Sequence, residues 1–109
     1  MKENKRGVVT PNIKELFEYF KVSYDVEFED KKFLRFMPYL DYLAKNSQTI
    51  DPRKIDSEER KILSDLKKLG VIDGGASSPI AFEYEFYIWL QQLLFKAYVL
   101  ELESVEDVL

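Results

Sequence analysis

The feature that most constrains this chain is its C-terminal stretch from Ser78 to Leu102, which is mostly apolar or aromatic and contains the only tryptophan. At about 100° per residue, as in a helix, this stretch forms two apolar walls separated by polar stripes. A surface helix needs one apolar stripe, so a helix with two must be covered on both sides, by the rest of the domain or by a partner chain. The pattern therefore predicts a long, central C-terminal helix and favours an interaction protein over an enzyme. The first wall consists of Phe82, Phe86, Trp89, Leu90, Leu93, Ala97 and Leu100, and the second wall of Tyr84, Ile88, Phe95, Val99 and Leu102.

The N-terminal part of the chain begins with a helix signal. A Thr-Pro pair at residues 10–11 is typical of a helix start, and apolar residues at helical spacing predict a short helix from Pro11 to about Lys21. Residues 22–25 are expected to break it. The segment from Tyr24 to Asp30 alternates apolar and acidic residues as a strand would, but no convincing second strand is available to pair with it. We therefore expect a loop or turn there.

Two more helices are predicted in the middle of the chain. Apolar residues at helical spacing run from about Asp30 to Asn46. Pro38 lies inside this pattern and is expected to kink or restart the helix, because an interior proline costs about 3 kcal/mol. The third helix has two possible starts, either Asp51-Pro52 or the capping box formed by Asp56 and Glu59. Gly70 is expected to end it with a left-handed cap.

Residues 72–78 form the clearest predicted loop, because Gly74-Gly75 gives backbone freedom, and Ser78-Pro79 then predicts the start of the long helix. With 109 residues, the chain is expected to be one domain, residues 1–109. Within it, residues 1–9 are a predicted flexible tail and residues 104–109 a predicted acidic tail. The predicted fold class is all-α, a small bundle of about four helices.

Composition excludes several classes of chemistry. The chain has no cysteine and no histidine, which removes thiolate nucleophiles, iron–sulfur ligation, ordinary zinc sites and Ser–His or Cys–His catalytic pairs. Its net charge is −4, and residues 71–109 hold one lysine against seven acids. Nucleic-acid affinity comes largely from phosphate neutralisation, so this balance weighs against nucleic-acid binding. The N-terminus has no signal-peptide pattern, and charged residues interrupt the long apolar stretch, so we expect a cytoplasmic protein without a membrane span.

Three groups of residues are candidate chemical sites, and for each a structural role is favoured. Gly74-Gly75 lacks the pattern of a phosphate-binding loop. The carboxylates could serve acid/base catalysis or a hard metal, but their pattern is typical of a solvated helix face. The cations of residues 53–68 could bind nucleic acid, although acids between them largely cancel their charge. These carboxylates are Glu58, Glu59, Asp65, Glu83 and Glu85, and the cations are Arg53, Lys54, Arg60, Lys61, Lys67 and Lys68.

Seven tyrosines are a further candidate for a binding surface, since tyrosine combines an apolar body with a polar tip. Packing at the edge of the core is the simpler explanation for most of them. Tyr87 and Tyr98 lie on a polar stripe of the predicted long helix, which makes them the better interface candidates. The full set is Tyr19, Tyr24, Tyr39, Tyr42, Tyr84, Tyr87 and Tyr98.

Two segments, residues 16–43 and 95–104, resemble the nitrogenase-stabilising/protective protein family (NifW), whose members are small and helical. The chain departs from the family at Val26, where members commonly have proline, and in residues 32–36, which lack the family's histidine. The family's closing segment is reduced to residues 105–109. The matching positions are Phe17, Phe20, Val22, Tyr24 and Asp25, then Phe33, Tyr39, Tyr42 and Leu43, and finally Ala97, Tyr98 and Ser104.

The resemblance implies a non-enzymatic accessory protein that binds the molybdenum–iron component of nitrogenase, or its assembly intermediates, and helps it mature or survive oxygen. It implies no cofactor and a tendency to self-associate into a homo-oligomer. No catalytic, cofactor-binding or metal-binding residue is predicted. Two other functions stay open: a small regulatory or viral helical protein that binds nucleic acid or another protein through residues 53–68, and an enzyme that uses only carboxylates and tyrosines. The predicted partner-binding residues are Tyr24, Asp25, Tyr42, Tyr87, Tyr98 and Ser104.

Overall fold

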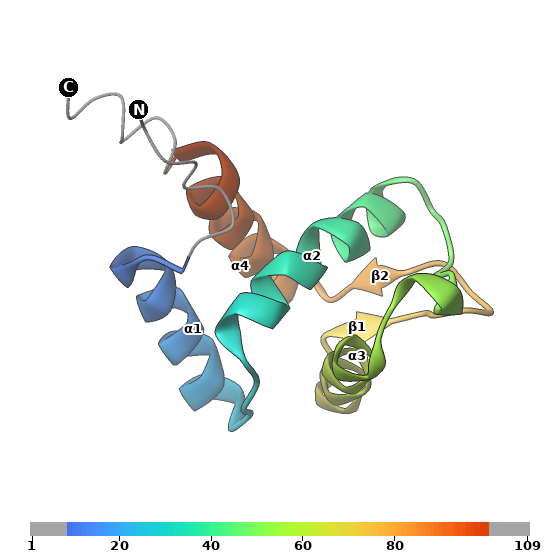
Figure 1. Cartoon of the computed structure of the whole chain (residues 1–109), viewed down its shortest axis with the longest axis horizontal. Helices are drawn as coiled ribbons and strands as arrows, with labels where there is room; N and C mark the ends of the chain where they lie inside the picture. Colours follow the sequence, from blue (N-terminus) through green and yellow to red (C-terminus); the bar gives the residue numbers. More distant parts are fainter. Residues whose placement is uncertain (1–8, 101–109) are drawn as a thin grey trace.

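The computed structural model describes residues 9–100 and the side chains of residues 9–98, and it is mostly helical (Figure 1). Four α-helices and one short antiparallel hairpin follow one another along the chain, so the helical fold class is confirmed. The elements are α1 (Pro11–Tyr24), α2 (Asp30–Lys45), the 3₁₀ turn η1 (Pro52–Lys54), α3 (Ser57–Leu69), β1 (Ile72–Asp73), β2 (Ala81–Phe82), α4 (Tyr84–Phe95) and the π-helical turn η2 (Lys96–Leu100).

The helix ends follow local chemistry. The side chain of Thr10 caps α1, and both predicted starts around the third helix are used: Asp51 caps η1 and Asp56 caps α3 with a complete capping box. Gly70 ends α3 in the left-handed conformation, at φ 80°. The predicted break of the first helix at residues 22–25 is wrong by one turn, because α1 continues to Tyr24 and only Asp25 adopts the left-handed cap.

The long C-terminal helix is the main wrong prediction. Ser78-Pro79 does not start it; instead β2 pairs with β1, with Ile72 opposite Phe82. The N–H of Glu83 then donates to the carbonyl oxygen of Val71 at 2.9 Å, and its carboxylate caps α4. Helix α4 therefore begins only at Tyr84, and the α-helical part ends at Phe95. Pairing of residues 81–82 with β1 replaces a helix start at this point. The same pairing makes Ile72–Asp73 a strand and not part of the predicted loop.

Helix α2 lies between α3 and α4 and contacts both (Figure 1). Its buried side chains span a wider arc than those of the other described helices. Pro38 lies inside α2 without ending it. The core is rich in aromatic rings: Phe20 stacks on Trp89 with ring centroids 4.6 Å apart, and Phe28 stacks on Phe33 at 4.2 Å. Phe33 of α2 also lies edge-on to Phe17 of α1 and to Trp89 of α4, so the rings join the three helices into one core.

Candidate protein-binding surface

Two grooves flank α4, one on each side. The α1/α4 groove has a volume of about 870 Å³ and is lined by Leu16, Tyr19, Phe20, Ser23, Tyr24, Tyr84, Glu85, Phe86, Ile88, Trp89 and Gln92. The α2/α4 groove has a volume of about 470 Å³ and is lined by Pro38, Asp41, Tyr42, Lys45, Asn46, Gln91, Leu94, Phe95 and Tyr98. Both volumes fall in the range of ordinary ligand and peptide pockets.

The two walls predicted for the C-terminal stretch differ in burial. In the first wall, Phe86, Trp89, Leu90, Leu93 and Ala97 are buried in the core. In the second wall, Tyr84, Ile88 and Phe95 are 74%, 42% and 49% exposed. The side chains of Val99, Leu100 and Leu102 lie outside the described residues. Helix α4 thus holds the domain together with one face and presents aromatic and aliphatic side chains to the outside with the other.

The α1/α4 groove has a rigid aromatic floor. Trp89 stacks on Phe20, and its indole N–H donates to the carbonyl oxygen of Leu16 at 3.2 Å. This hydrogen bond spans the two helices and fixes the ring. The rim is formed by Tyr19, 68% exposed, and by Tyr84. A fixed floor with exposed tyrosines at the rim suits the capture of an apolar side chain from a partner.

The electrostatic field at this groove is negative. Burial raises the pKa of Tyr24, and the charges of Glu83 and Glu85 raise it further. Among the described residues that line the groove, Glu85 is charged and no lysine or arginine is present. A partner segment with positive charge beside its apolar side chains complements this groove best.

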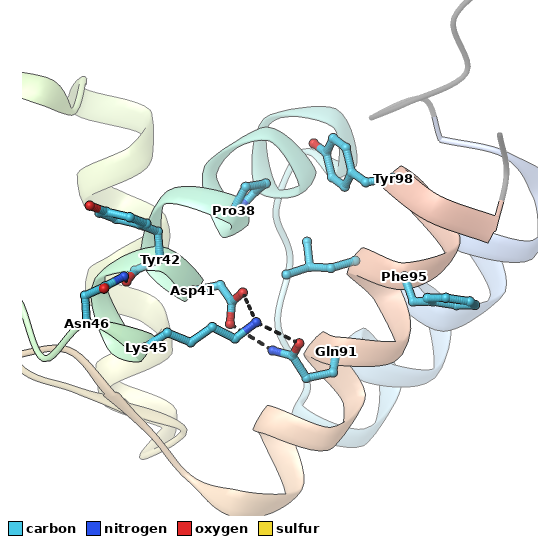
Figure 2. Close-up of a pocket in the computed structure, with 9 residues that line it drawn as sticks. Pro38, Asp41, Tyr42, Lys45, Asn46, Gln91, Phe95 and Tyr98 are labelled. Carbon is cyan, nitrogen blue, oxygen red and sulfur yellow. Dashed lines mark hydrogen bonds and ion pairs between the residues drawn. The ribbon is translucent and has the colours of Figure 1, made fainter.

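The α2/α4 groove contains a polar network (Figure 2). The Lys45 ammonium lies 2.9 Å from the Asp41 carboxylate, and the Gln91 amide donates to the same carboxylate at 2.8 Å. Asp41 is the one buried charged side chain in the described part of the chain. The hydrogen bond to Asp41 raises the pKa of Lys45, so the lysine stays charged. The network ties α2 to α4 across the groove.

At the other end of this groove, Tyr98 compensates for Pro38. A proline has no N–H to donate to the carbonyl four residues earlier, which here is that of Leu34. The Tyr98 hydroxyl donates to this carbonyl oxygen at 3.2 Å. Burial raises the pKa of Tyr98 and keeps the hydroxyl protonated as a donor. Phe95 lies between these two polar contacts along the helix but points away from α2 (Figure 2).

The predicted partner-binding residues are not gathered at one site. Tyr42 and Tyr98 line the α2/α4 groove, and Tyr24 lines the α1/α4 groove. Tyr87 lies against the hairpin, beside Pro79 and Phe82. Asp25 caps the end of α1, and Ser104 lies outside the described residues. Only Tyr42 and Tyr98 share a groove.

Sequence reasoning missed the network of Asp41, Lys45 and Gln91. A signal was present, because Asp41 follows Met37 by four residues and Leu34 by seven, which places a carboxylate on the apolar face of α2. An acid at such a position needs a buried partner. Gln91 could not be assigned as that partner, because it lies 50 residues away.

Several of the other candidate residues have structural roles. The Glu59 carboxylate completes the capping box of α3, and the Glu83 carboxylate accepts backbone N–H groups at the start of α4. At Gly74, φ is 93°, and an added Cβ would lie 2.0 Å from the carbonyl oxygen of Pro79. In the part of the chain that the structure describes, no three acidic residues gather where they could hold a metal ion. None of the helices described there has the length and apolar character that crossing a membrane requires.

Comparison of the chain with protein-family models, with curated proteins and with solved structures gives no match. The resemblance to the nitrogenase-protective family therefore stays a prediction based on its matching positions.

Proposed function

We propose that this chain is a non-enzymatic interaction protein that binds a protein partner through the two grooves flanking α4. One observation carries the proposal: of the six large hydrophobic residues that are exposed in the described part of the chain, five line these grooves. Scattered exposed apolar residues are normal on a protein surface, whereas a gathering of them marks an interaction site. The five are Tyr19, Tyr42, Tyr84, Ile88 and Phe95, and the sixth is Val22.

The partner segment that fits this surface is an amphipathic helix with apolar anchors and a basic flank. Tyr84 and Ile88 are four residues apart on α4, so they form one exposed stripe beside the α1/α4 groove. A helix laid into such a groove uses anchors at similar spacing. Glu83 and Glu85, whose charges act on Tyr24, favour lysine or arginine on the partner.

The resemblance to the NifW family supplies a specific partner, the molybdenum–iron component of nitrogenase. On this proposal the chain would shield or hold that component by steric contact, because it has no cysteine with which to consume an oxidant. A second copy of the chain is the alternative occupant of the same surface. In that case the exposed wall of α4 would form a homo-oligomer interface.

The test compares two substitutions of exposed β-branched residues. Ile88→Asp introduces a charge on the proposed surface, and Val22→Asp introduces the same charge on α1 outside both grooves. Binding to purified molybdenum–iron protein is measured by interferometry, and the mass of the free chain by light scattering. We expect Ile88→Asp to weaken binding at least tenfold, and Val22→Asp to leave it within about twofold, because a buried unpaired charge costs far more than an exposed one.

The result also decides between the two occupants. If the wild-type chain binds the nitrogenase component and Ile88→Asp does not, the accessory role is supported. Loss of a dimer on Ile88→Asp, without binding to nitrogenase, would assign the surface to self-association. A monomer whose heterologous binding is equally affected by both substitutions would contradict the proposed surface.

A further inference from the structure

The outer face of α3 carries a concentration of positive charge that the sequence order conceals. At about 100° per residue, the residues opposite the buried Ile62 and Leu66 are cations and serines. All of them are exposed. We call this set the α3 basic face: Ser57, Arg60, Lys61, Ser64, Lys67 and Lys68.

Of the acids that alternate with these cations in the sequence, Glu58 is exposed, and the others make contacts within the fold. Asp56 caps α3 and forms an ion pair with Lys32 of α2, and Glu59 turns back to the backbone N–H of Asp56. Asp51 pairs with Arg53 beneath the helix start. Asp65 pairs with Lys61 at one edge of the face. On the outer surface of the helix, Lys61 is thus paired with an acid, whereas no ion pair involves Arg60, Lys67 or Lys68 among the described residues.

The β1–β2 hairpin continues this face. Helix α3 contacts β1, and Figure 1 shows the helix beside the hairpin, on the opposite side of the molecule from α1. A Cβ added at Gly75 would lie 3.2 Å from the Lys67 ammonium, so this lysine reaches over the hairpin connection. The connection then presents the exposed residues Ser77 and Ser78. An exposed cationic helix and a polar hairpin tip thus form one surface.

We propose that this surface binds duplex DNA, with α3 in the major groove and the hairpin tip against the adjoining backbone. The DNA major groove admits an α-helix, whereas the major groove of duplex RNA is too deep and narrow for one. Cations and serine hydroxyls are the groups that contact phosphate oxygens. The net charge of −4 does not oppose this, because the excess acid lies in residues 71–109 and not on α3. The surface is separate from the grooves along α4, so this inference is independent of the proposed function.

The experiment uses the full chain and a fluorescent DNA duplex of about 20 base pairs, the scale of a site spanning two helical turns. Anisotropy is followed as salt rises from about 50 to 200 mM. With three phosphate contacts, from Arg60, Lys67 and Lys68, affinity should fall about fortyfold over this range. Lys67→Glu combined with Lys68→Glu should lose at least tenfold at the lower salt and should reduce the salt slope by roughly 2.

The matched control is Lys14→Glu combined with Lys31→Glu, which makes the same change in net charge at exposed lysines of α1 and α2. It should stay within about threefold of wild type, since these lysines lie outside the α3 basic face. Thermal unfolding of each variant verifies that it is folded. Equal losses in the two double variants, no binding at the lower salt, or tighter binding to duplex RNA or single strands would each overturn the proposal. Ile88→Asp should leave DNA binding unchanged, which separates this result from the test of the α4 grooves.

Discussion

The hydroxyl of Tyr98 donates a 3.2 Å hydrogen bond to the carbonyl oxygen of Leu34, the carbonyl that Pro38 leaves without an intrahelical donor. This contact joins residues 64 positions apart. It explains how α2 continues past an interior proline, because the donor that the proline lacks is supplied by the C-terminal part of the chain. The same hydrogen bond holds the Tyr98 end of the α2/α4 groove against α2.

Tyr98→Phe should destabilise the chain by about 1 kcal/mol, since it removes one hydrogen bond from a buried carbonyl. In the Pro38→Ala background the same substitution should cost less, because the alanine would supply the missing backbone N–H. Denaturant unfolding of the wild type, the two single variants and the double variant gives the coupling energy. Additive effects of the two substitutions would show that the hydroxyl does not serve the proline site.

Two lysine–aspartate pairs with the same i,i+4 spacing allow a matched comparison of burial. Asp41→Asn should cost about 1–3 kcal/mol, because Asp41 is buried and also accepts from Gln91. Asp65→Asn should cost about 0.3–0.5 kcal/mol, because its pair with Lys61 lies on the surface. Unfolding in urea measures both. Similar costs at the two positions would contradict a structural role for the network in the groove.

The Asp56 carboxylate should make stability depend on pH. Its pKa in the folded chain lies below the ordinary value of 3.8, first because Lys32 donates to it and then because the N–H of Glu59 does. The unfolded chain therefore takes up a proton at higher pH than the folded chain. The stability contributed is present above about pH 4 and is lost as pH falls through the lowered pKa.

Asp56→Asn keeps a capping side chain without the charge, so the difference in melting temperature between wild type and variant should shrink as pH falls from about 6 to 3. Lys32→Met should act in the same direction, because it removes the main cause of the lowered pKa. Melting curves by circular dichroism at several pH values test this. A constant difference across the range would show that the Asp56 charge makes no contribution.

Two glycines with positive φ should respond differently to alanine. Gly70→Ala should cost about 1 kcal/mol, as expected for a left-handed residue with a side chain, since no atom lies within 4 Å of the added Cβ. Gly74→Ala should cost at least twice as much, because its Cβ would collide with the Pro79 backbone. The hairpin would have to open to relieve this collision. Chemical denaturation of both variants decides the order, and equal losses would contradict the tight hairpin.

Local sequence was sufficient for most helix boundaries. Thr10 and Asp56 were identified as caps and Gly70 as a terminator, because each acts within one turn of its own position. The first apolar wall of the C-terminal stretch is confirmed from Phe86 to Ala97, since helical spacing alone defines it, but Phe82 belongs to β2 and not to the helix. Pro38 was expected to kink or restart the helix, but α2 does not restart there. The contact with Tyr98 could not be foreseen, because the two residues lie far apart in the chain.

Sequence patterns alone predicted that the chain is helical, that it lacks cysteine and histidine chemistry, and that Trp89 belongs to its apolar core. The start of α4 depends on contacts between distant segments, because the pairing of β2 with β1 replaces the expected first turns of that helix. The folded arrangement also sets which wall of α4 is exposed and which acidic side chains near α3 form contacts away from its outer face. Local rules act over three or four residues, whereas strand pairing, groove formation and ion pairing such as that of Lys32 with Asp56 depend on segments that meet only after folding.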